Sequence, residues 1–132
     1  MGRNRSFDED DVVARAGARF LATGYEATSV DDLVGVTGLH RGSIYRAFGS
    51  KRGLFLAVLR QVDANDELTP RRIDTVLVAL LELAPVDDEV REITRRIIAR
   101  FPQGDAAAAL GARLMDRAGI AVQPPTTRRT TS

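Results

Sequence analysis

The chain has 132 residues, of which 44 % are hydrophobic and 28 % are charged, as expected for one globular domain or two very small ones. No apolar run approaches the roughly 20 residues that a membrane-spanning helix needs, which argues against a membrane protein. Cysteine is absent, which excludes a disulfide framework and a thiolate zinc site. The N-terminal stretch is acidic where a secretion signal would be apolar, so the sequence predicts a cytoplasmic protein. The net charge of +1 indicates no particular partner.

Two helix start signals lie near the N-terminus. Ser6 followed by Glu9 has the form of a capping box. Apolar residues then recur at helical spacing until Gly24, which suits the left-handed conformation of a C-cap. Thr28 and Ser29, each three residues before an aspartate, form the second signal. The sequence therefore predicts a long first helix and a short second one.

Glycine marks the turn after the second helix. Gly38 is expected to adopt a positive φ, and a third helix is predicted at about residues 39–46. Ser50 can cap a fourth helix that reaches Val62. Two short helices joined by a glycine turn are typical of a helix-turn-helix unit, predicted here at residues 29–48. No strand pattern with period two occurs, so the fold class is predicted to be all-α.

The second half of the chain is predicted to hold a reduced helical region at residues 67–119. Thr69-Pro70 opens an amphipathic helix that Pro85 ends, Asp87 opens another, and an alanine-rich stretch forms the last. Residues 120–132 are rich in proline and threonine and show no periodicity, which predicts a disordered tail.

A series of marks recurs in order and without a gap between residues 12 and 59. They are Phe20, Gly24-Tyr25, Thr28-Ser29-Val30, Asp32-Leu33, Gly38-Leu39, Gly42-Ser43-Ile44-Tyr45, Phe48, Ser50-Lys51 and Leu54-Phe55. This pattern resembles the N-terminal DNA-binding domain of the tetracycline-repressor (TetR/AcrR) family of bacterial transcription regulators. The resemblance covers residues 6–66 and implies four short helices that bind double-stranded DNA. Members of that family normally add a long helical domain for ligand binding and dimerisation, so the C-terminal half is expected to be shortened.

The third predicted helix supplies the candidates for base contacts. At 100° per residue, one sector of this helix holds Arg41, Gly42, Tyr45 and Arg46, opposite the apolar anchors. Arg41 and Tyr45 are predicted to contact base edges in the major groove, where arginine can take both acceptors of guanine. Gly42 lacks a side chain, which lets the backbone approach the DNA closely.

The candidates for phosphate contacts lie around this helix. They are Thr28, Ser29, His40, Ser43, Arg46 and Lys51. The two hydroxyl residues lie at a helix N-terminus, which favours an anion, and the lysine has the corresponding place at the start of the fourth helix. Such contacts position a protein on DNA without reading its sequence. Each residue alone also has an ordinary explanation, as a cap, a solvated charge or part of the core; their joint order favours DNA binding.

Arginines also line the helix that follows Asp87. Asp87 with Arg91 and Glu92 with Arg96 have the i,i+4 spacing of ion pairs, which would neutralise this face. It is therefore predicted to be a solvated surface and not a second DNA-binding patch.

The sequence argues against an enzyme. One histidine and no cysteine leave no metal cluster and no pair of nucleophile and base, and no glycine-rich phosphate loop occurs. The sequence thus predicts no catalytic residue, no metal and no cofactor.

Two functional hypotheses follow. The first is a homodimeric transcription regulator, a repressor that binds a near-palindromic operator. The second is a truncated or degenerate relative whose C-terminal half is only a protein-interaction module. Apolar residues in the second half exceed what three short helices hide, which favours a subunit interface. The same helices are too few to enclose a cavity of about 300 Å³ or more, so no closed pocket is predicted within residues 69–118. A small-molecule effector, which the sequence does not identify, is then expected only at the interface.

Overall fold

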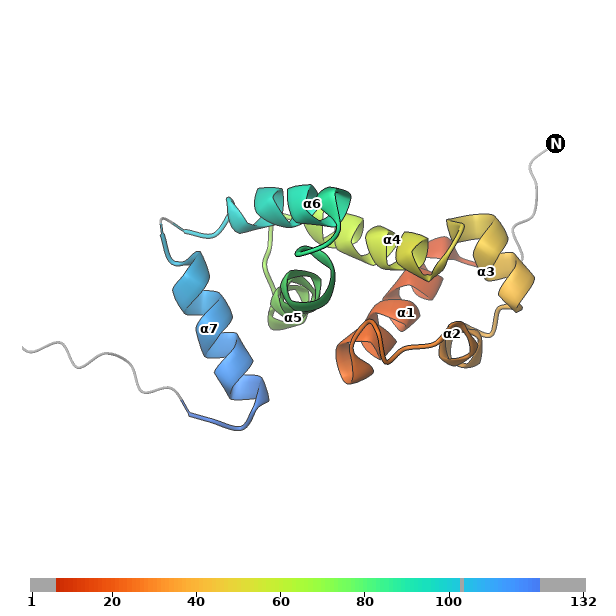
Figure 1. Cartoon of the computed structure of the whole chain (residues 1–132), viewed down its shortest axis with the longest axis horizontal. Helices are drawn as coiled ribbons and strands as arrows, with labels where there is room; N and C mark the ends of the chain where they lie inside the picture. The colour runs from red at the N-terminus through yellow and green to blue at the C-terminus, as the bar shows by residue number, and fades with distance from the viewer. Residues whose placement is uncertain (1–6, 103, 122–132) are drawn as a thin grey trace, which may run out of the picture.

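The computed structural model describes residues 7–102 and 104–121, and the regular secondary structure within them is entirely helical. In chain order the elements are α1 (Glu9–Thr23), α2 (Val30–Thr37), α3 (Arg41–Phe48), α4 (Lys51–Asp63), α5 (Pro70–Val78), the π-helical turn η1 (Ala79–Leu83), α6 (Asp88–Ile98) and α7 (Ala106–Arg117). The prediction of an all-α fold is confirmed. In Figure 1 the molecule is elongated, with α2 and α3 near one end and α7 at the other, while α4 and α6 lie side by side between them.

Helix α1 begins later than the sequence pattern predicts. Its N-cap is Asp8, whose carboxylate accepts a hydrogen bond from the backbone N–H of Asp10 at 3.0 Å. Asp8 therefore supplies the cap that was expected from Ser6, while the predicted capping box of Ser6 and Glu9 involves Ser6, which lies outside the described residues. At the other end Gly24 has a φ of 89°, which favours glycine, but its ψ of 170° lies outside the left-handed helical region that was expected.

The start of α2 and the turn to α3 follow the prediction closely. The Ser29 hydroxyl accepts from the N–H of Asp32 at 3.0 Å, and the Asp32 carboxylate accepts from the N–H of Ser29 at 2.9 Å. These two bonds form the expected capping box. Gly38 adopts the left-handed conformation, with a φ of 74°. Helix α3 begins at Arg41, later than predicted, because His40 is extended and serves as its N-cap.

Helices α1 to α4 share one apolar core. Phe20, Tyr25 and Phe55 cluster in it, with ring centroids 5.3 to 5.7 Å apart. Leu33 of α2 and Ile44 of α3 are completely buried and anchor the two short helices. Burial of a side chain of this size stabilises the fold by roughly 1.5–3 kcal/mol. This packing compensates for helices too short to be stable alone.

The turn between α3 and α4 explains a glycine that the sequence pattern leaves unexplained. A Cβ atom at Gly53 would lie 1.8 Å from the backbone carbonyl oxygen of Phe48. The Ser50 hydroxyl caps α4 and accepts from the N–H of Gly53 at 2.9 Å, which holds this first turn against the end of α3. Only glycine fits such a close approach.

The C-terminal half begins as predicted. Pro70 is the first residue of α5, and the Thr69 hydroxyl accepts from the N–H of Arg72 at 3.3 Å. The helix then continues into η1, whose wider π-helical hydrogen bonding was not predicted. Asp87 caps α6 as expected, by accepting from the N–H of Val90 at 3.1 Å.

The arginines of α6 are neutralised by carboxylates, as expected, but not by the partners that i,i+4 spacing predicts. Arg96 reaches Asp63 at the end of α4 at 3.0 Å. Asp87, the predicted partner of Arg91, instead binds Arg52 at 2.6 Å across the contact between α6 and α4. Tertiary packing therefore redirects Arg96 and Asp87, while Arg91 and Arg95 pair with Asp88 and Glu92 on the same helix.

Two remaining predictions concern the tail and the membrane. Of the tail predicted at residues 120–132, residues 122–132 lie outside the described residues. Among the described residues, no helix is both long and apolar enough to cross a membrane.

Candidate nucleic-acid interface

Helix α3 presents one sector to solvent. Arg41, Gly42, Tyr45 and Arg46 are all exposed, while Ile44 on the opposite side is completely buried. Tyr45 leaves 43 % of its surface accessible, a large fraction for an aromatic residue. The rotation of the helix therefore matches the sector that helical spacing predicts. A short helix of this kind can enter a groove as wide as the major groove of DNA.

An ion pair joins the exposed sides of α2 and α3. The Arg41 guanidinium donates to the carboxylate of Asp31, and this hydrogen bond raises the pKa of the arginine. Both side chains are more than half exposed, so solvent screens the attraction between them. Asp31 thus positions Arg41, and little free energy is needed to break this ion pair when another acceptor approaches.

Arg46 differs from Arg41 because it has no carboxylate partner among the described residues. Its positive charge is therefore not neutralised locally. Beside it, a Cβ atom at Gly42 would meet only the Arg46 guanidinium at 3.9 Å. The helix surface is open at this point, with room for another backbone to approach.

The two hydroxyl residues at the N-terminus of α2, Thr28 and Ser29, differ in their exposure to solvent. Thr28 is completely buried; its hydroxyl donates to the carbonyl of Gly24 at 2.6 Å and lies 2.7 Å from the hydroxyl of Thr23. No part of this side chain is accessible to a phosphate. Ser29 is exposed, but it binds Asp32, and the N–H and hydroxyl of Ser29 lower the pKa of that carboxyl. A carboxylate therefore already occupies this helix terminus.

Lys51 is the first residue of α4 and is half-buried. Its amine donates to the carbonyl of Tyr25 at 3.1 Å and lies 4.3 Å from the centre of the Tyr25 ring, where a cation is favoured. Burial raises the pKa of the Tyr25 hydroxyl, so that ring stays neutral. Two N–H groups of the amine are left for an anion. At the start of α3, His40 is exposed and makes no side-chain cap, and Ser43 is half-buried.

A sequence profile described as "Bacterial regulatory proteins, tetR family" matches residues 12–58, the stretch that holds this surface. This part of the chain is a tetR-family helix-turn-helix domain. The resemblance found in the sequence is thereby confirmed for α1 to α4.

Three curated relatives share the tetR-type domain. The HTH-type transcriptional repressor ComR of Escherichia coli (strain K12) is 46 % identical over 63 residues, which are 47 % of this chain and 30 % of ComR. YezE of Bacillus subtilis (strain 168), an uncharacterized HTH-type transcriptional regulator, is 45 % identical over 60 residues, 46 % of this chain and 31 % of YezE. The HTH-type transcriptional repressor BdcR of Escherichia coli (strain K12) is 29 % identical over 107 residues, 81 % of this chain and 51 % of BdcR. The chain thus spans about a third to a half of the length of these relatives. No solved structure matches it.

Two residues around the tetR-type domain were missed in the sequence. The sequence pattern identifies Asp31 only as part of a helix start, whereas in the structure its carboxylate binds Arg41. Glu82 of η1 accepts from the backbone N–H of Tyr25 at 2.7 Å and from that of Glu26 at 3.0 Å. The C-terminal half therefore holds the loop that leads into α2. A single carboxylate within an apolar stretch, as at Glu82, indicates a specific partner, but the sequence does not identify that partner.

Proposed function

We propose that this chain is a sequence-specific DNA-binding transcription regulator that acts as a repressor. The observation that carries the proposal is the exposed sector of α3, which combines arginine, glycine and tyrosine on a helix anchored by Ile44. The names of ComR and BdcR as transcriptional repressors support the direction of regulation. Nothing in the proposal requires a catalytic residue, a metal or a cofactor, and we propose no enzymatic activity.

The base contacts are assigned to Arg41, Gly42 and Tyr45. Arg41 leaves Asp31 and donates both arms of its guanidinium to guanine, while Gly42 lets the helix backbone approach the groove. Tyr45 offers an exposed ring and hydroxyl beside them. Asp31 then increases the specificity of binding. On DNA without a guanine at this position, Arg41 stays paired with Asp31 and makes no base contact.

The phosphate contacts are assigned to five side chains that are at least partly accessible. They are Ser29, His40, Ser43, Arg46 and Lys51. Arg46 has the strongest physical basis because its charge is not neutralised, and Ser29 has the weakest because Asp32 lies beside it. Thr28 is left out of the set, since its hydroxyl is buried and already bonded.

Selection from a pool of random duplex DNA tests the assignment of function. The purified chain is expected to enrich one near-palindromic sequence. The affinity of the Arg41→Ala variant for that sequence is expected to fall by roughly 1–3 kcal/mol, with little change on random DNA. Arg95→Ala is the matched control, because this exposed arginine on α6 pairs with Glu92, away from α3. Enrichment of no sequence would overturn the proposal, and equal losses on both DNAs would make Arg41 a backbone contact.

The salt dependence of binding separates phosphate from base contacts. Each lost phosphate contact removes about 0.9 from the slope of log affinity against log salt concentration. Lys51→Ala is therefore expected to flatten the slope by about this amount. An unchanged slope would show that the amine stays on Tyr25 and touches no phosphate.

The homodimer is proposed from the distribution of exposed apolar side chains. Five large ones lie in the C-terminal half: Leu81, Val86, Leu114, Met115 and Ile120. In the tetR-type domain, among the described residues, only Tyr45 is comparable. Exposed apolar side chains concentrated in one half of the chain favour a protein interface there, and a second copy of the chain would supply the twofold symmetry of a near-palindromic site.

Light scattering of the purified chain distinguishes this dimer from the alternative, a C-terminal half that is only a module for other proteins. The homodimer is supported if the chain dimerises and the double variant Leu114→Glu, Met115→Glu has a higher dissociation constant for the dimer. If the chain is strictly monomeric at concentrations that saturate operator DNA, the alternative of a module for other proteins is favoured.

A further inference from the structure

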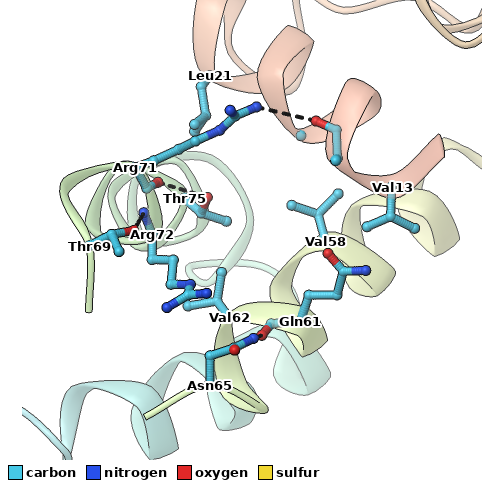
Figure 2. A pocket seen from close by; sticks show the side chains of 12 residues that line it. Val13, Leu21, Val58, Gln61, Val62, Asn65, Thr69, Arg71, Arg72 and Thr75 are labelled. Carbon is cyan, nitrogen blue, oxygen red and sulfur yellow. Dashed lines mark hydrogen bonds between the residues drawn. The ribbon is translucent and has the colours of Figure 1, made fainter. Parts of the chain in front are cut away.

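A groove runs between α1, α4 and α5, apart from the exposed sector of α3. Its volume is about 280 Å³ and it is open to solvent on one side. The side chains of Val13, Leu21, Val58 and Val62 give it apolar walls (Figure 2). Gly17 also lines it, and a Cβ atom there would lie 3.2 Å from a methyl group of Val58, so the absence of a side chain keeps the groove deep.

Two arginines at the start of α5 flank the groove. Figure 2 shows Arg71 extended toward α1, where it donates to the carbonyl of Ala14 at 3.3 Å. Arg72 extends toward the end of α4 and donates to the carbonyl of Glu67. Both partners are neutral backbone groups, which satisfy single N–H donors and leave each positive charge uncompensated.

This pairing sets the two arginines apart from the others in the C-terminal part of the molecule. Eight arginines from α4 onward lie within ion-pair distance of a carboxylate: Arg52, Arg60, Arg91, Arg95, Arg96, Arg100, Arg113 and Arg117. Within the described residues, Arg71 and Arg72 have no such partner, and none of the residues that line the groove is acidic. Gln61, which lines the groove, donates through its side-chain amide to the carboxylate of Asp10 at 3.2 Å.

We propose that this groove binds a small organic carboxylate with a compact apolar body. One guanidinium group, that of Arg71 beside α1 or that of Arg72 beside the end of α4, takes the carboxylate, since its planar donors match the two oxygens. The valine walls take the apolar part. The volume lies at the lower end of that of small-molecule pockets, which limits the body to about the size of one aromatic ring. The ligand would bridge the tetR-type domain and α5 within one subunit, whereas the sequence pointed only to an interface between subunits.

Four probes separate charge from shape: benzoate, neutral benzamide, cationic benzylammonium and acetate, which has the charge without the ring. Titrations use the full chain without DNA and follow the NMR signals of the methyl groups of Val13, Val58 and Val62. Benzoate is expected to shift these signals at concentrations where the other three probes do not. It should also raise the melting temperature, since a ligand that binds only the folded state stabilises it.

The arginines are tested by Arg71→Gln, Arg72→Gln and the double variant, with Arg95→Gln on α6 as the matched control. The double variant is expected to bind benzoate at least about tenfold more weakly, and the control is expected to bind as the unchanged chain does. Both residues are accessible, so the variants should keep the fold, which the melting temperature without ligand verifies. Benzoate that binds the double variant undiminished, or benzamide that binds as well as benzoate, would overturn the proposal, as would a titration without any methyl shift. Because no DNA is present, these outcomes are independent of those that test the regulator.

Discussion

The end of the molecule formed by α2 and α3 and the half formed by α5 to α7 leave opposite kinds of side chain exposed. At the first, the apolar anchors Leu33 and Ile44 are completely buried, while Arg41 and Arg46 face solvent. In the second, most arginines are neutralised by carboxylates, and large apolar side chains are exposed instead. An exposed, weakly held positive charge suits a phosphate backbone, and exposed apolar surface suits protein. This difference supports the proposal that the first region binds DNA and the second binds a protein chain.

The two regions share an apolar core but differ in one contact that fastens their helices, a close backbone approach between α3 and α4 in the first and an ion pair between α5 and α7 in the second. The largest expected effect comes from Gly53→Ala at the junction of α3 and α4. Its new Cβ atom would lie 1.8 Å from the carbonyl oxygen of Phe48, so the backbone must move. Chemical denaturation is expected to show a loss of about 3 kcal/mol in the free energy of unfolding, at the upper end of overpacking costs.

Gly35→Ala in α2 is the matched control, since nothing lies within 4 Å of the added atom. Alanine is the better helix former by roughly 1 kcal/mol, so this variant is expected to gain stability. If both variants changed stability alike, the close approach at Gly53 would not be what holds the turn.

Gly38 and Gly53 show which features of the fold can be predicted from the sequence and which cannot. The left-handed turn at Gly38 and the cap at Ser29 were predictable because they depend on residues close together in the chain. The need for Gly53 was not, since it arises from the meeting of α4 with the end of α3. The exposed sector of α3 was predictable as well, because it depends only on helical spacing. The burial of Thr28 and the hydrogen bond from the N–H of Tyr25 to Glu82 were not, because they depend on the tertiary fold.

The second largest effect should come from the ion pair that fastens α7 to α5. Arg113 donates to both oxygens of Asp74, at 2.7 and 2.9 Å, and Asp74 is almost completely buried. Arg113→Met leaves that carboxylate without its main partner, which is expected to lower the free energy of unfolding, by less than Gly53→Ala does. Hydrogen exchange is expected to accelerate mainly in α7. Acceleration spread evenly over all helices would mean that the pair does not hold α7 in particular.

A smaller effect is expected at the contact that joins the two regions. The Glu82 carboxylate accepts two backbone N–H groups of the loop between α1 and α2. Glu82→Gln keeps one acceptor oxygen but loses the charge, so we expect a loss of about 1.5 kcal/mol in unfolding free energy. Affinity for operator DNA should fall as well, because this loop leads into the helix-turn-helix. Glu89→Gln, an exposed carboxylate change on α6, is the control. Reduced stability with unchanged operator affinity would show that Glu82 supports the fold alone.

The smallest effect is a pH dependence at the contact between α4 and α6. Hydrogen bonds from Arg52, supported by the N–H of Val90, hold the pKa of Asp87 at about 2, below its ordinary value of 3.8. A carboxyl whose pKa is lower in the folded state stabilises the fold above pH 3.8 and loses that contribution as the pH falls toward 2. Solvent reaches Arg52 and screens the attraction, so the contribution is about 1 kcal/mol. The Arg52→Met variant is therefore expected to lose about this much stability at pH 7 and to approach the unchanged chain near pH 2, as measured by urea denaturation across this range. A difference between the two proteins that stays constant from pH 7 to pH 2 would mean that Arg52 acts by packing and not through the charge of Asp87.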